Sequence, residues 1–194
     1  MATRTMGLLP FLRAVILFCA LFGFSQFTGA HRGQAVHNCP YGVWCAIVAG
    51  YALDDPTPLN ERPLVQWVNQ PRGQVLVSHF PDYPTNTGIA MMCTRDSSTT
   101  NPLVTQLEYT WKPPGEEQQT YFDVSSVAGD PFVNEGFNMT AKDPVTPVDP
   151  RCYGAYCAPG DSNCNQVYAK SNDNFSGMRT CSDEVDLFLT LCSG

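Results

Sequence analysis

The chain has 194 residues, of which 43% are apolar and 15% charged, and its 11 basic against 18 acidic side chains give a net charge of −7. A chain of this size and apolar content can bury a core of its own, which argues against a disordered tail. The acidic balance and the isolated basic residues exclude the positive face that a nucleic-acid-binding protein needs.

Residues 1–30 predict a secretory signal peptide. They contain Arg4 and Arg13 but no acid, followed by an apolar run over residues 14–24, which is shorter than the roughly 20 residues of a membrane-spanning helix. Small residues just before position 31 place the cleavage after Ala30. The mature domain would be residues 31–194, with no membrane association after cleavage. An uncleaved signal anchor is the alternative.

Short β-branched and aromatic runs between turn-forming residues predict an all-β chain. Turn signals such as residues 54–58 and 112–115 separate these runs. Their number, with no repeat and no long linker, predicts one sandwich or barrel domain. The predicted strands are Gln34–His37, Val43–Ala49, Leu64–Val68, Gln74–His79, Ile89–Cys93, Leu103–Trp111, Tyr121–Val127 and Val185–Leu191.

The cysteine count predicts a disulfide framework. Nine cysteines, less Cys19 in the predicted signal peptide, leave eight, and an even number in an exported chain is typical of paired cysteines. A zinc site is the alternative, but no C-x2-C pair occurs, so we expect no metal and no cofactor. Residues 151–181 contain four of the eight and show little strand pattern, which predicts a loop-rich lobe held by disulfides.

Two Asn-X-Ser/Thr triplets, at Asn138 and Asn174, predict N-glycosylation and surface loops at both positions.

Segments in three parts of the chain resemble the thaumatin-like proteins. Residues 36–44, VHNCPYGVW, are similar to the family's opening strand. Residues 106–110, QLEYT, and 121–127, YFDVSSV, are similar to its Ala-Glu-Phe and Tyr-Asp-Val-Ser strands. The cysteine spacing from Cys152 to Cys192 also matches. The resemblance, to a small form of the fungal secreted branch, implies a thaumatin-like β-sandwich with a small disulfide-stapled loop lobe.

The resemblance also implies which cysteines pair. Carried over position by position, the pairs are Cys39–Cys192, Cys152–Cys181 and Cys157–Cys164. Cys45 and Cys93 have no counterpart in the family and are expected to bond to each other.

Thaumatin-like proteins have a cleft lined by one arginine and four acids. One of the four acids is missing, because its position in this sequence is Ala128. Glu135, in a segment similar to the family's Asp-Gly-Phe-Asn, is the favoured substitute, and Asp130 is the other candidate. The remaining matched positions are Arg95, Glu108, Asp123 and Asp173.

Carboxyl groups crowded in a cleft cannot all ionise, so one can serve as a general acid beside an ionised base or nucleophile. In a retaining glycosidase, Glu108 would be the acid and Asp123 the nucleophile, with Arg95 holding one acid ionised; we expect at most a weak endo-β-1,3-glucanase. The alternatives are an ion-pair network and a cleft that only binds. Trp111, next to a turn, is the aromatic residue expected to be most exposed to a sugar.

The resemblance therefore implies a secreted protein whose acidic cleft binds cell-wall β-glucan or another wall polysaccharide. The second hypothesis is a non-catalytic adhesin or effector that binds a host or wall protein. A minor third is copper binding by His31, as the N-terminal residue, together with His37 or His79.

Overall fold

The computed structural model describes residues 32–50, 65–82, 87–112, 119–143, 151–172, 177–182 and 185–194. The predicted signal peptide, His31, Asp173 and Asn174 lie outside these residues. In the described part the regular elements are β-strands and a short 3-10 segment, Phe80–Asp82. None of its elements is a helix long and apolar enough to cross a membrane.

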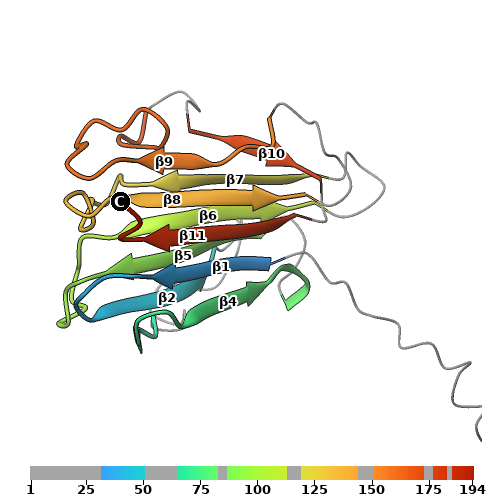
Figure 1. Ribbon diagram of the computed structural model, residues 1–194. Helices are drawn as coiled ribbons and strands as arrows, with labels where there is room; N and C mark the ends of the chain where they lie inside the picture. The colour runs from blue at the N-terminus through green and yellow to red at the C-terminus, as the bar shows by residue number, and fades with distance from the viewer. Residues whose placement is uncertain are drawn as a thin grey trace, which may run out of the picture.

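The strands form two sheets (Figure 1). The five-stranded sheet has the order β4 (Val75–His79), β1 (Arg32–His37), β11 (Asp186–Leu191), β8 (Phe137–Lys142) and β9 (Ala155–Cys157). The six-stranded sheet has the order β10 (Arg179–Cys181), β7 (Thr120–Ser125), β6 (Thr105–Trp111), β5 (Gly88–Thr94), β2 (Val43–Ala49) and β3 (Val68–Gln70). β1 and β11 pair in parallel, although they lie near opposite ends of the sequence.

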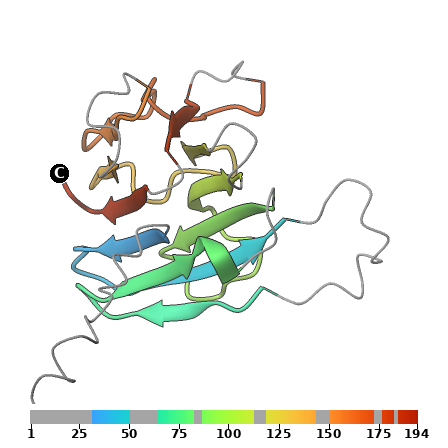
Figure 2. The same ribbon diagram turned by 90° about the vertical axis from the view of Figure 1, so that its right-hand side faces the viewer.

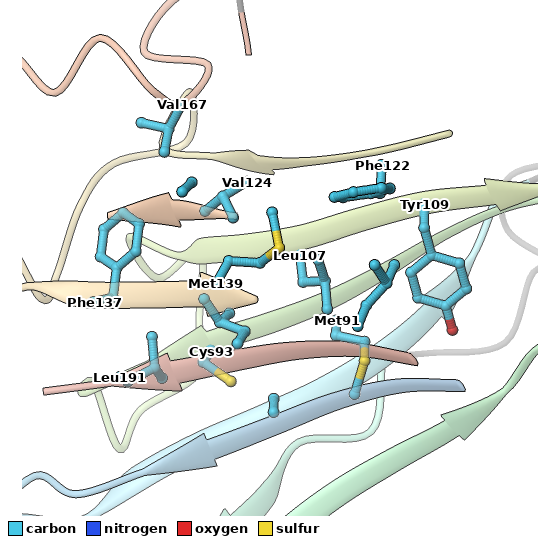
Figure 3. Close-up of a cluster of buried hydrophobic side chains, with 14 of the residues drawn as sticks. Met91, Cys93, Leu107, Tyr109, Phe122, Val124, Phe137, Met139, Val167 and Leu191 are labelled. Atoms are coloured by element: carbon cyan, nitrogen blue, oxygen red, sulfur yellow. The ribbon is translucent and has the colours of Figure 1, made fainter. Parts of the chain in front are cut away.

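The core lies between the two sheets because the strands alternate buried and outward-facing side chains. Leu107 on β6 and Phe122 on β7 point inward from the six-stranded sheet, and Met139 on β8 and Leu191 on β11 face them from the five-stranded sheet (Figure 3). These side chains are fully or almost fully buried. The all-β sandwich expected from the sequence is confirmed.

Seven of the eight predicted strands are confirmed with small shifts at their ends. The prediction Leu64–Val68 is wrong for residues 65–67, which precede the strand; β3 begins at Val68. Val65 and Val68 are both exposed, so the apolar run that suggested a strand is not buried. The strands β8, β9 and β10 were not predicted.

The sequon at Asn138 lies in a strand, so the surface loop expected there is wrong. Phe137 and Met139 of β8 are buried, while Asn138 and Thr140 alternate with them on the outward face. The alternation is regular, but Asn, Met, Ala and Lys are weaker strand formers than β-branched and aromatic residues. Pairing with β11 and β9 on either side forms the strand.

Four disulfides join the cysteines that were expected to pair. Three of these pairs were implied by the family resemblance, and the fourth joins the two cysteines that have no counterpart in the family. Cys39–Cys192 links the chain just after β1 to the chain just after β11. Cys45 and Cys93 are directly opposite in the β2–β5 ladder. The other two, Cys152–Cys181 and Cys157–Cys164, hold residues 151–181, which also contribute the short edge strands β9 and β10. Figure 2 shows this lobe on the side away from β2 and β4.

Candidate functional site

Glu108 and Asp123 meet on the outward face of the six-stranded sheet. Their neighbours Leu107 on β6 and Phe122 on β7 point into the core, so the next side chain along each strand points out. Glu108 and Asp123 are directly opposite in the β6–β7 ladder, and their carboxyl groups are hydrogen bonded to each other. The sheet register thus brings together two of the acids that the resemblance assigned to one cleft.

One of these two carboxyl groups holds a proton near neutral pH. Burial, and then the negative charge of Glu108, raise the pKa of Asp123 to about 7. Burial also raises the pKa of Glu108, but hydrogen bonds from Ser125 and Asp123 oppose this change. The two carboxyl groups therefore titrate as a pair.

Arg179, which the sequence analysis did not single out, supplies a positive charge that acts on Asp123. This charge opposes the rise in the pKa of Asp123. The Arg179 side chain is only 3% exposed. Its Nε donates to the Gly154 carbonyl at 3.2 Å, Nη2 donates to the Gln166 carbonyl at 2.8 Å, and Nη1 donates to the Gly177 carbonyl. Burial lowers the pKa of Arg179, and nearby Tyr153 and Asp123 raise it.

Arg179 therefore does two things. It joins three loop segments of the 151–181 lobe through their carbonyl groups, and its charge acts on Asp123 of β7. A lone arginine in a segment without a strand pattern carries no sequence signal for this position, because the contacts come from the folded lobe.

A hollow of about 380 Å³ lies on one side of the acidic pair. It is lined by the small residues Gly50, Gly88 and Ala90 of the β2 and β5 region, and by Tyr121 and Met178. The small size of Gly50, Gly88 and Ala90 leaves this space open. This volume is within the usual range of small-molecule sites, roughly 300–1,000 Å³.

A second hollow, of about 320 Å³, lies on the other side of the pair and also includes Glu108 and Asp123. Gln106 lies two residues from Glu108, Ser125 lies two residues from Asp123, and the two are opposite each other in the β6–β7 ladder. They line this hollow together with Tyr168. We call the two hollows together the groove. It runs along β6 and β7, and the acidic pair lies at its middle.

Arg95 and Glu135 form a second, separate group. Arg95 Nη1 lies 3.6 Å from Glu135 Oε1, and its guanidinium group stacks on the Tyr41 ring at 4.3 Å. Burial, and then a hydrogen bond with Glu135, raise the pKa of Tyr41 to about 12. Ala90 is opposite Glu108, and Arg95 lies five residues farther along β5, which corresponds to about 17 Å at roughly 3.3 Å per residue.

The structure thus places the residues matched to the family's cleft in two groups. Glu108 and Asp123 share the groove, and the charge of Arg179 acts on Asp123, while Arg95 pairs with Glu135. Asp130 lies near Glu135: its Oδ1 accepts hydrogen bonds from Thr105 Oγ1 at 3.2 Å and from the Phe132 N–H at 3.1 Å. Burial raises the pKa of Asp130.

The expectation that Trp111 is exposed is wrong. Its side chain is half-buried against the core and its indole nitrogen is inaccessible, because β6 continues through Trp111 and pairs it with Thr120 on β7. His37 is 2% exposed and its Nε2 lies 2.7 Å from the Gln70 carbonyl oxygen. This contact occupies one ring nitrogen of His37, and the other, Nδ1, is buried.

Comparison with known proteins decides the family. The sequence pattern of the Blastomyces yeast-phase-specific (Bys1) proteins matches residues 68–193, from β3 through β11. The chain belongs to the Bys1 family.

This Bys1 protein is also similar to curated thaumatin-like proteins of fungi. It is 33% identical over 129 residues to the secreted thaumatin-like protein calA of Emericella nidulans, covering 64% of this chain and 66% of calA. It is 30% identical over 91 residues to the antigenic thaumatin-like protein of Arthroderma benhamiae, covering 47% of this chain and 41% of that protein. The expected membership of the thaumatin-like proteins is confirmed.

Solved structures show the same fold for this Bys1 protein. The protein elicitor MoHrip2 from Magnaporthe oryzae is 18% identical, with a TM-score of 0.58 over 84% of this chain and 100% of that chain. The thaumatin-like xylanase inhibitor TLXI is 13% identical, with a TM-score of 0.50 over 82% of this chain and 98% of that chain.

Proposed function

We propose that the protein is secreted and that its groove binds a cell-wall β-glucan without hydrolysing it. Secretion is supported by the signal-peptide pattern of residues 1–30, by four disulfides, which persist in oxidising compartments, and by the relative calA, which is named a secreted protein.

The shape and chemistry of the groove support a sugar chain as the ligand. The groove extends along two strands, which suits an extended polymer. The carboxyl oxygens of Glu108 and Asp123 can accept hydrogen bonds from sugar hydroxyls. Tyr121 offers an aromatic ring to the apolar face of a sugar.

The direct pairing of Glu108 and Asp123 across the β6–β7 ladder carries the proposal that binding occurs without hydrolysis. Glycosidases need their two carboxyl groups about 5–5.5 Å apart for retention or 6.5–9.5 Å apart for inversion, because a sugar carbon, or a sugar carbon and a water, must fit between them. Directly opposed side chains on one face of a sheet are neighbours, with Cβ atoms about 4.5–5.5 Å apart, and these two carboxyl groups act on each other's pKa. We therefore assign the pair to binding rather than to hydrolysis.

A pull-down on insoluble β-1,3-glucan tests the proposal, with reducing ends counted in the same tubes. We expect the secreted protein to bind without releasing reducing ends, and Glu108→Gln to bind more weakly. Glu135→Gln makes the same chemical change in the other acidic group, and we expect it to bind like the unmodified protein. Release of reducing ends that disappears in Glu108→Gln would show a glucanase and contradict the proposal.

A protein partner is the second candidate. It is favoured by the fold neighbour TLXI, which is described as an inhibitor of a xylanase, and by MoHrip2, described as a protein elicitor. If the protein does not bind glucan, this candidate gains support. A function on another face of the sandwich would survive Glu108→Gln, which separates the two candidates.

A further inference from the structure

The outward face of the five-stranded sheet carries the sequon Asn138-Met139-Thr140. Met139 is fully buried, whereas Thr140 is exposed and Asn138 is half-buried. Side chains two residues apart on a strand point to the same side, so Asn138 and Thr140 share the outward face. This face is on the opposite side of the sandwich from the groove (Figure 1).

An exposed aromatic ring lies next to Asn138. Tyr156 on the edge strand β9 is directly opposite Asn138 and is 47% exposed. Directly opposed residues of an antiparallel pair have Cβ atoms about 4.5–5.5 Å apart. The first sugars attached to the Asn138 amide would therefore lie within reach of the Tyr156 ring. Thr190 on β11, opposite Asn138 on its other side, adds a hydroxyl group to the same row.

The backbone of Tyr156 is held in place on its outer edge. Its N–H donates to Gln166 Oε1 at 3.1 Å, and its carbonyl oxygen lies 3.6 Å from Cys164 Sγ. The disulfide Cys157–Cys164 fixes Cys164 beside β9, and Gln166 follows two residues later. A ring on a fixed backbone loses little conformational freedom when a sugar packs on it, which favours the contact.

We propose that Asn138 carries an N-linked glycan whose first sugars pack on Tyr156 and cover this part of the five-stranded sheet. In the modification, the Asn138 amide nitrogen forms a bond to the anomeric carbon of a lipid-linked oligosaccharide, loses a proton, and releases the lipid diphosphate. Because Met139 is buried in the folded sheet, the transfer takes place before β8 pairs. The proposal rests on the secretion included in the proposed function, and it leaves the groove uncovered.

Peptide mapping of the full chain secreted from a eukaryotic host tests the modification. We expect a glycan on the peptide containing Asn138, its loss in both Asn138→Gln and Thr140→Ala, and its retention in Thr140→Ser, which preserves the sequon. Thr140→Ala keeps the native asparagine and provides a second variant if Asn138→Gln is not secreted. Secreted protein with unmodified Asn138 would overturn the inference, whereas absence of secretion would contradict the proposed function.

Chemical nitration of tyrosines tests the contact. Tyr153 is 51% exposed, close to the value of Tyr156, but it lies against the Arg179 guanidinium at 4.7 Å rather than opposite the sequon. We expect nitration of Tyr156 to be several-fold slower in glycosylated protein than in Thr140→Ala, and nitration of Tyr153 to be equal in both. Equal nitration of Tyr156 would overturn the packing of the glycan on this ring.

Discussion

Tyr109 on β6 crosses the core and lies against Gly33 on β1. A Cβ atom at Gly33 would come within 2.6 Å of Tyr109 Cε1 and 2.9 Å of Met91 Sδ. The Tyr109 hydroxyl donates to Ser78 Oγ on β4, and its ring centre is 4.5 Å from that of Phe80. This one side chain therefore fixes the separation of the two sheets beneath the groove, where Tyr109 and Glu108 are adjacent along β6.

Gly33→Ala should destabilise the fold, because the added methyl group needs space that the ring occupies. We expect a loss of about 1–3 kcal/mol in the free energy of unfolding, measured by urea denaturation. Gly88→Ala is the control, since its nearest contact would be Thr110 Oγ1 at 3.7 Å, and its stability should stay within about 1 kcal/mol of the unmodified protein. Equal effects of the two substitutions would contradict the close approach.

The shared proton of the acidic pair makes stability depend on pH. The pKa of Asp123 is about 7 in the folded protein against 3.8 for a free side chain, so the folded state binds this proton more tightly than the unfolded chain does. The contribution of Asp123 to the free energy of unfolding therefore falls as the pH rises from about 4 to about 7, and is constant below that window.

Asp123→Asn should remove this part of the pH dependence. The difference between the two proteins across the window has an upper limit of about 4 kcal/mol, because one pKa unit corresponds to about 1.4 kcal/mol. Glu108→Gln removes the neighbouring charge and should move the window to lower pH. Urea midpoints measured across the window check both expectations, and parallel pH profiles for all three proteins would contradict them.

Removal of Arg179 should release the 151–181 lobe. Arg179→Gln leaves buried carbonyl groups without their donors and Asp123 without its cation, and we expect a loss of about 2–5 kcal/mol in the free energy of unfolding. Limited proteolysis should show faster cleavage within residues 151–172. Lys142→Gln is a control at an exposed cation that stacks on Phe188. Unchanged proteolysis of Arg179→Gln would rule out its role in holding the lobe.

The four disulfides should contribute unequally to stability. In the chain-entropy model the benefit grows with the length of chain enclosed, so Cys39–Cys192, with a separation of 153 residues, should contribute about 5 kcal/mol and Cys157–Cys164, with a separation of 7, about 2 kcal/mol. Replacing both cysteines of each disulfide by serine and measuring thermal unfolding gives the order of their contributions to stability. If removal of Cys157–Cys164 lowered stability more than removal of Cys39–Cys192, native contacts rather than chain entropy would determine the contribution of each disulfide.

The strand content was largely predictable because most strands are short, apolar and bounded by turn formers. β2, Val43–Ala49, was predicted with both ends as observed. β9 and β10 were not predicted, since each has only three residues. Each is held by disulfide-linked loops and by the neighbouring strand, rather than by an apolar pattern in its own sequence. Local sequence carries little information about such strands.

The acidic pair was predictable, but its surroundings were not. The motif match identified Glu108 and Asp123, and the sheet register explains their contact. The cation was expected to be Arg95, which lies after β5 and pairs with Glu135, whereas the charge that acts on Asp123 is that of Arg179 in the lobe. Which of several arginines approaches a carboxylate depends on how distant segments pack, and no spacing along the chain encodes it.

The parallel pairing of β1 with β11 has a consequence for biosynthesis. β1 lies between β4 and β11, so its second hydrogen-bonded edge is unmatched until residues 186–191 have been made. Contacts between such distant segments form slowly, because a long loop must close first. The growing chain therefore presents an incomplete sheet to its surroundings until β11 has been translated. Chaperones that shield open strand edges are expected to act on this chain during that interval.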